Sequence, residues 1–235
     1  MTGATVRVLP VALTLLALPP GRPPRSSSPL DRVPLRTVAL APVAIPEEIP
    51  DSARAQDAFE RLLTDALQRA GVTVVPAHEA GVIWKRLVDS VGGFFSAFTG
   101  TLDDVKYNAV QNGTLRELRA RFGADALIRP RIWIAMIPWR NGNAKWDGTS
   151  EGIGGGGSGT LPALTLYVAM YDVDGHEIYS GQGGIQVMMK TSLLHRDELH
   201  DLDPNKLLTD EGRNRKAVQL ALDSLAAVVA RSRAP

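Results

Sequence analysis

The residues best suited to chemistry gather near position 200, where two histidines lie among several acids. His195 and His200 flank Glu198, with Asp197 and Asp201 close by. Imidazole nitrogens and carboxylate oxygens can ligate a metal ion or transfer protons. The five-residue separation of the histidines does not place them on one helical face, and it differs from the H-E-x-x-H spacing that converges on zinc. The pattern therefore favours a solvated polar loop over a metal site.

Two further groups of acids have simpler explanations than catalysis. Asp103 and Asp104 could form a carboxylate pair for acid–base work, but adjacent aspartates are more typical of a solvated loop. Asp172-x-Asp174-Gly175 resembles the start of a calcium loop, yet the later ligands and the closing glutamate are missing. The pair Asp174-Gly175 is instead a strong hairpin signal, because glycine accepts the positive φ of such turns.

The glycine-rich segment 151–159, EGIGGGGSG, does not match a nucleotide or nucleophile motif. It lacks the Lys-Ser/Thr of a phosphate-binding loop, and GGSGT does not complete G-x-S-x-G. We expect residues 141–160 to form a flexible loop between two strands. The chain has no cysteine, which excludes disulfides, thiolate zinc sites and a cysteine nucleophile. No catalytic residue, metal ligand or cofactor is therefore predicted, and we expect a protein that is not an enzyme.

Aromatic side chains are the stronger candidates for function. The candidate partner-binding residues are Phe94, Phe95, Phe98, Trp139, Arg140 and Trp146. Exposed aromatic and arginine side chains are favoured at protein interfaces. The alternative is that the phenylalanines plug the core, with one tryptophan in the core and two packed within a loop. Trp133 alternates with Arg131, so we expect both on one face of a strand.

Hydrophobic periodicity predicts a single α/β domain over residues 36–231. The expected strands cover 36–43, 72–75, 124–137, 161–172 and 177–190, and the expected helices cover 51–70, 79–91, 114–122 and 213–230. Thr114 and Glu117 have the spacing of a capping box at the start of the third helix. The predicted order is β-α-β-α-α-β-β-β-α, which indicates a mixed β-sheet with helices packed on it.

The first 35 residues differ in composition from the domain. Residues 1–18 contain Arg7 and an eleven-residue apolar run, which fits the core of an export signal and is too short to span a bilayer. The cleavage site is poor, so the segment could instead remain as an anchor or be a disordered leader. Residues 19–35 are rich in proline and serine and indicate a linker. This pattern predicts an exported protein of the periplasm or envelope, with peripheral membrane association through its N-terminal segment.

The charge balance argues against a nucleic-acid partner. The net charge is +1, with 26 basic and 25 acidic residues. Three of the arginines lie in the first thirty residues, which hold no acid, so the remainder is slightly acidic. Nucleic-acid-binding domains usually show a basic stripe, and none is visible here.

Four segments resemble a family of bacterial envelope proteins that includes the curli-secretion lipoprotein and the lipoproteins that activate penicillin-binding proteins. The segments are RTVALAPV, AGVTVVP, GADALIRPRI and LTLYVAMYDVDGHEIYSG. The N-terminal domain of the Tol-Pal β-propeller protein is a more distant relative in shape. The resemblance implies a non-enzymatic domain that binds envelope partners or oligomerises. The lipidated cysteine typical of that family is absent, and no functional residue carries over.

Three hypotheses follow. The first is a non-catalytic cell-envelope module that binds a protein partner or self-assembles, using the loop of residues 92–104 and the glycine-rich loop. The second is a metal-dependent or carboxylate-based hydrolase, which requires the acids and histidines above to meet in one cleft. The third is a carrier of a small apolar ligand, which requires a cavity lined by the three phenylalanines.

Overall fold

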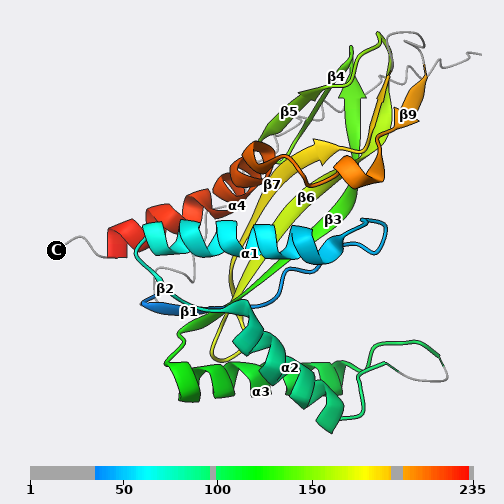
Figure 1. Cartoon of the computed structure of the whole chain (residues 1–235). Coiled ribbons are helices and arrows are strands. Elements are labelled where there is room, and N and C mark those ends of the chain that lie inside the picture. Colours follow the sequence, from blue (N-terminus) through cyan, green and yellow to red (C-terminus); the bar gives the residue numbers. More distant parts are fainter. Residues whose placement is uncertain (1–34, 96–98, 192–197, 233–235) are drawn as a thin grey trace, which may run out of the picture.

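The computed structural model describes residues 35–95, 99–191 and 198–232, and all structural statements below concern them. Its centre is a mixed sheet of seven strands with four α-helices packed on it, as Figure 1 shows. The predicted α/β class is therefore confirmed. The elements are β1 (Thr37–Leu40), α1 (Ser52–Arg69), β2 (Thr73–Val75), α2 (Ala77–Ser90), α3 (Asp104–Phe122), β3 (Ala126–Arg140), β4 (Asn143–Trp146), β5 (Thr149–Gly152), β6 (Ser158–Asp172), β7 (Glu177–Val187), β8 (Met189–Thr191), β9 (Leu199–Asp201) and α4 (Glu211–Ser232).

Two long strands form the spine of the sheet. β3 and β6 pair antiparallel along 15 residues, from Ala126 opposite Asp172 to Arg140 opposite Ser158. β1 runs parallel to both β2 and β3, and β7 runs antiparallel to β6. The β4–β5 hairpin extends the far end of β3, and β8 and β9 form a separate pair. The sheet is therefore much longer along β3 and β6 than the helices that cover it.

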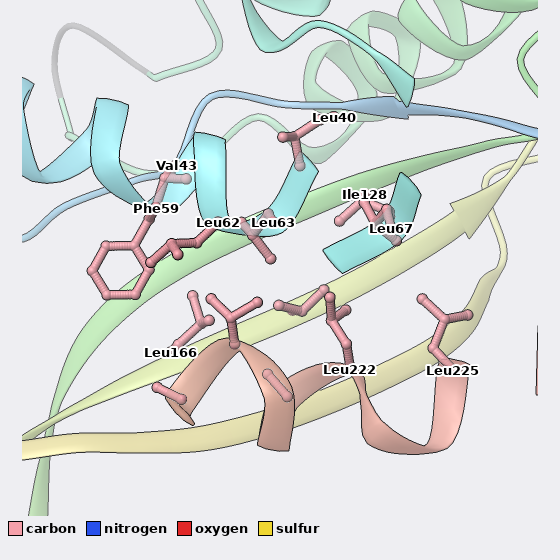
Figure 2. Packing of buried hydrophobic residues seen from close by; sticks show 14 of the residues in the cluster. Leu40, Val43, Phe59, Leu62, Leu63, Leu67, Ile128, Leu166, Leu222 and Leu225 are labelled. Atoms are coloured by element: carbon pink, nitrogen blue, oxygen red, sulfur yellow. The ribbon is translucent and has the colours of Figure 1, made fainter. Parts of the chain in front are cut away.

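Helices α1 and α4 cover one face of the sheet and build the largest core. The predicted periodicity of α1 is confirmed, since Phe59, Leu63 and Leu67 are fully buried (Figure 2). Each such side chain stabilises the fold by roughly 1.5–3 kcal/mol relative to exposure. Asp51 occupies the N-cap position without a side-chain capping bond, and Gly71 turns the chain into β2 with a φ of 87°.

Glycines in β7 let α4 approach the sheet closely. A Cβ atom built on Gly183 would lie 2.0 Å from the Ala217 carbonyl oxygen. One built on Gly181 would lie 2.1 Å from the Ala221 carbonyl oxygen. That same carbonyl accepts a hydrogen bond from the buried Tyr179 hydroxyl. The backbone of α4 therefore lies so close to β7 that only glycine fits at positions 181 and 183.

Helices α2 and α3 cover the opposite face at one end only, beside β1, β2 and the start of β3. Their shared core contains Ile83, Leu115, Leu118 and Leu127. Beyond this core the outward face of β3 and β6 is left free of helices (Figure 1). This uncovered stretch carries the site described below.

The predicted start of the third helix at residue 114 is wrong. α3 begins ten residues earlier, because the Asp103 carboxylate caps its first turn by accepting from the Lys106 amide at 3.1 Å. Thr114 is buried in mid-helix and its hydroxyl donates to the Val110 carbonyl. Glu117 forms ion pairs with two arginines instead of closing a capping box.

The prediction of a flexible loop over residues 141–160 is also wrong for most of that segment. Two turns with positive φ at both central residues, Asn141-Gly142 and Asp147-Gly148, fold it into the β4–β5 hairpin. Residues alternate between exposed and buried along β4, and Trp146 points into a third core at this end of the sheet. β6 then begins at Ser158, inside the segment predicted as a loop.

The predicted strand 177–190 is divided in the structure. β7 ends at Val187, and the Met188 amide donates to the Pro162 carbonyl before β8 starts at Met189. β8 pairs with β9, which lies in a region that the sequence marked only as polar and charged. The predicted second and fourth helices agree with α2 and α4 to within a few residues at each end. The remaining predicted elements agree with the structure equally well.

Candidate functional site

A groove opens on the uncovered face of the sheet, between α2–α3 and the strands β3 and β6. Its volume is about 540 Å³, within the range of ligand-binding clefts. Small residues of the sheet, the loop after β1 and α2 form its floor, and aromatic side chains form its walls. The small residues are Ala41, Ala44, Ala80, Gly81 and Ala169, and the aromatic ones are Trp84, Tyr107, Tyr167 and Tyr171. The lining also includes a pair of arginines, Arg129 and Arg131.

Arg129 is held by rings on three elements. Its guanidinium carbon lies 5.0 Å from the centre of the Trp84 ring, 5.6 Å from Tyr107 and 6.0 Å from Tyr171. Nη1 donates to the Tyr107 hydroxyl and to Gln111 Oε1 at 3.2 Å. Contacts between a cation and ring faces stabilise by roughly 0.5–2 kcal/mol each. The guanidinium is therefore fixed in place with donors left over.

Arg131 stands one pleat further along the same face of β3. Its guanidinium carbon lies 4.8 Å from the Tyr167 ring, directly across the strand pair, and 5.6 Å from Trp133. The predicted placement of Trp133 and Arg131 on one strand face is thereby confirmed. Trp133 is 40% exposed, which is unusual for a side chain of this size and rules it out as the predicted core tryptophan.

Tyr171 lies in the groove beside an acidic residue of β7. Burial, with the nearby charge of Glu177, raises the pKa of Tyr171 above its ordinary value of 10, although Arg129 acts in the opposite direction. The Tyr171 hydroxyl donates to Glu177 at 3.4 Å. At neutral pH Tyr171 is therefore uncharged and adds no negative charge beside Arg129.

The predicted phenylalanine cluster joins this groove from behind Trp84. Phe94 packs edge-on against Trp84 and Tyr107, with ring centres 6.0 and 5.5 Å apart, and Phe95 follows at 5.3 Å from Phe94. Phe95 is 64% exposed. Phe98 lies outside the described residues. The phenylalanines therefore buttress one wall of the groove rather than line its interior.

The second predicted group lies at the other end of the sheet. Trp146 is buried in the third core, and the Trp139 ring packs over Gly157 and over Gly159 of β6. Arg140 is exposed at the end of β3. The structure thus separates these three residues from the phenylalanines instead of forming one surface.

The residues of the hydrolase hypothesis are also apart. Asp103 and Asp104 lie at the start of α3, whereas Glu198 and His200 lie at or beside β9, at the opposite end of the molecule (Figure 1). His195 lies outside the described residues. Asp103 is engaged in capping, so the described members of this set share no cleft.

One acid–histidine cluster does form, in the turn between β6 and β7. Ligand atoms of Asp172, Asp174 and His176 lie within 4.8 Å of one another. The Asp172 carboxylate accepts the amides of both Asp174 and His176, at 3.0 and 2.9 Å. These bonds are what the tight turn requires, as the Asp-Gly hairpin signal indicates.

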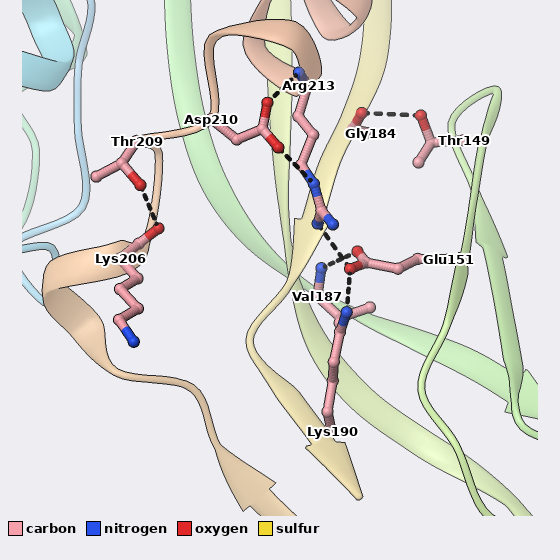
Figure 3. A network of polar contacts seen from close by, with 9 residues as sticks. All are labelled: Thr149, Glu151, Gly184, Val187, Lys190, Lys206, Thr209, Asp210 and Arg213. Atoms are coloured by element: carbon pink, nitrogen blue, oxygen red, sulfur yellow. Dashed lines mark hydrogen bonds and ion pairs between the residues drawn. The ribbon is translucent and has the colours of Figure 1, made fainter.

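A buried carboxylate ties the hairpin to α4. Glu151 of β5 accepts hydrogen bonds from Arg213 Nη1 at 2.6 Å, Lys190 Nζ at 2.7 Å and the Val187 amide at 3.0 Å (Figure 3). Burial alone would raise the pKa of Glu151, but Lys190, the Val187 amide and Arg213 together outweigh it and hold that pKa below its ordinary 4.5. Glu151 is thus ionised, and its hydrogen bonds link β5 to β7 and α4.

Comparisons with known proteins give loose likenesses. No protein-family model matches the chain, and no curated protein matches it. Among solved structures, lipoprotein GNA1162 from Neisseria meningitidis is 18% identical, with a TM-score of 0.31, covering 64% of this chain and 81% of that one. A dodecameric PelC variant from Paraburkholderia phytofirmans is 13% identical, with a TM-score of 0.29, covering 79% and 91%. Both scores are well below 0.5.

In the part of the chain that the structure describes, no helix is both long and apolar enough to cross a bilayer.

Proposed function

We propose that this protein is a non-catalytic module of the cell envelope that binds a protein partner through the groove between α2–α3 and the sheet. The observation that carries the proposal is the pair of ring-stacked arginines in an open cleft of about 540 Å³. Aromatic and arginine side chains dominate the binding energy of protein interfaces. The envelope location rests on the apolar leader and the proline-rich linker of the first 35 residues.

The rim of the groove extends the same surface. Trp133 lies beside Arg131, and Phe95 lies beyond the wall formed by Trp84, both with large exposed ring areas. Clusters of exposed apolar residues on a folded domain mark interaction sites. Together they favour a partner that reaches across the groove.

Photo-crosslinking in cells tests this function. Full-length protein carrying a photoreactive phenylalanine analogue in place of Trp133 is irradiated in intact cells, and the adducts are identified by mass spectrometry. We expect one discrete adduct in the envelope fraction, which is lost when Ala44→Trp fills the groove. The same analogue in place of the exposed Val105 of α3, which does not line the groove, is the control. An adduct that survives Ala44→Trp, or no adduct, contradicts the proposal.

Self-assembly is distinguished by the same experiment. An adduct of twice the protomer mass that contains only this chain's peptides identifies a second copy as the partner. The hydrolase hypothesis has no shared cleft among the described residues to support it, and a substrate screen with Asp103→Ala and His200→Ala tests it separately. Both variants should leave the crosslinking of a binding module unchanged.

A further inference from the structure

We propose that the groove recognises an acidic segment of the partner, with carboxylates at alternate positions of an extended peptide paired to Arg129 and Arg131. This inference rests on the proposed function and names the chemistry of the partner. It follows from four features of the groove: the charge of its lining, the guanidinium donors without an acceptor, the arginine spacing, and the small residues of the lining.

The positive charge of the groove has no counter-charge in its lining. Among the residues that the structure describes, the lining includes two arginines and no aspartate or glutamate, and the Glu177 carboxylate lies outside it, bonded to the Tyr171 hydroxyl. Some arginines of the described residues are paired with carboxylates, as Arg86, Arg213 and Arg215 are. Arg129 and Arg131 contact rings, a hydroxyl and an amide oxygen instead. An anion is therefore the complementary ligand.

Most guanidinium donors of the two arginines have no hydrogen-bond acceptor among the described residues. A stacked ring occupies the face of a guanidinium plane, whereas its N–H donors point outward in that plane. Only Nη1 of Arg129 is used, by Tyr107 and Gln111, and Arg131 has only ring contacts among the described residues. Such donors match the two oxygens of a carboxylate, and charge-assisted pairs of this kind are about twice as strong as neutral ones.

The arginine spacing selects for an extended peptide. Arg129 and Arg131 are two residues apart on β3, so their Cα atoms are separated by roughly 7 Å along the strand. Alternate side chains of an extended peptide have the same repeat and the same side. A segment with the pattern acid-x-acid, lying along β3, therefore brings one carboxylate to each arginine.

Small residues make room for such a segment. Ala44, Ala80 and Ala169 line the groove, and Gly81 lets Pro42 come so close that an added Cβ would lie 3.0 Å from the Pro42 ring. Trp84 stands above this floor as one wall, where it can cover the apolar stem of a glutamate. These small side chains leave open volume beside the arginines, about 540 Å³ in the groove as a whole.

Calorimetric titration of the full-length protein tests the inference. The probe is acetyl-Glu-Ala-Glu-Ala-amide, with acetyl-Gln-Ala-Gln-Ala-amide as the uncharged match, acetyl-Glu-Glu-Ala-Ala-amide as the spacing match, and inorganic phosphate as a simple anion. We expect the alternating acidic peptide to bind most tightly of the four. Arg131→Gln should weaken it at least about tenfold, equivalent to about 1.4 kcal/mol. Arg116→Gln, an exposed arginine of α3 outside the groove, should leave the affinity unchanged.

A second variant separates the groove from general charge attraction. Ala44→Trp keeps both arginines and fills the cleft from an exposed position, so it should abolish binding without unfolding the protein. Equal affinity for the glutamine peptide, binding that survives both Arg131→Gln and Ala44→Trp, or phosphate binding without peptide discrimination overturns the inference. If the cellular crosslink still depends on the groove in any of these cases, the acidic ligand is refuted and the binding function stands.

Discussion

Replacing Glu151 by glutamine should destabilise the protein by about 2 kcal/mol at pH 7. The carboxylate is 8% exposed and is paired with Lys190 and Arg213, whose side chains are 33% and 39% exposed. Because both cations reach solvent, each pair is worth about 1 kcal/mol, the upper end for exposed pairs, instead of the 1.5–3 kcal/mol of charged hydrogen bonds in general. Glutamine retains an oxygen for the Val187 amide, so only the two ionic contacts are lost.

The stability difference between the original protein and Glu151→Gln should depend on pH. The pKa of Glu151 is lower in the folded protein than its ordinary 4.5, so folding is favoured by ionisation. The stabilisation is therefore complete above the ordinary value and disappears as pH falls through the folded value. The gap between the original protein and Glu151→Gln should close over that acidic range.

Thermal and denaturant unfolding measure the effect. For a domain of this size, about 2 kcal/mol corresponds to a lowering of Tm by about 6 °C. Glu211→Gln removes a glutamate that pairs with Arg215 on the exposed surface of α4, and it should leave Tm unchanged within error. Equal midpoints for Glu151→Gln and the original protein at pH 7, or a gap that persists unchanged in acid, would refute the assigned role.

Three further predictions concern stability and are checked by the same unfolding assays. Gly183→Ala should destabilise by more than about 3 kcal/mol, because its Cβ would collide with the Ala217 carbonyl and push α4 off the sheet; a mild effect would contradict that close approach. Asp103→Ala should cost about 1 kcal/mol by removing the cap of α3, with Asp103→Asn nearly neutral. Tyr179→Phe should cost about 1 kcal/mol, since it removes the buried hydrogen bond from the Tyr179 hydroxyl to the Ala221 carbonyl, and an unchanged midpoint would show that this bond does not stabilise the fold.

The sequence predicts correctly those features that depend on a single helix or turn. The apolar spacing of α1 and α4 reports burial against the sheet, and the Asp174-Gly175 turn follows from local backbone geometry. The β4–β5 hairpin had signals of the same kind, Asn141-Gly142 and Asp147-Gly148, which were masked by the glycine-rich stretch that follows. Reading both pairs as turns would have predicted the hairpin.

The groove could not be predicted from the sequence, for a different reason. Trp84, Tyr107, Arg129 and Tyr171 come from α2, α3, β3 and β6, and only the packing of helices on the sheet brings them together. In the sequence they are isolated aromatic and basic residues with no recurring spacing. The one usable signal was Arg129 beside Arg131 on alternate positions of a predicted strand, since charged residues facing the same way in a long strand indicate an uncovered face.

The central claim is that the groove is the binding surface, and the four tryptophans of the chain test it within one sample. Indole N–H signals of ¹⁵N-labelled full-length protein are followed by NMR during titration with acetyl-Glu-Ala-Glu-Ala-amide and assigned with single Trp→Phe variants. Trp84 and Trp133 adjoin the arginines, whereas Trp139 and Trp146 pack at the hairpin end of the sheet. The account predicts saturable shifts of the Trp84 and Trp133 signals with the other two unmoved. Unchanged Trp84 and Trp133 signals at saturating peptide, or shifts confined to Trp139 and Trp146, would contradict it.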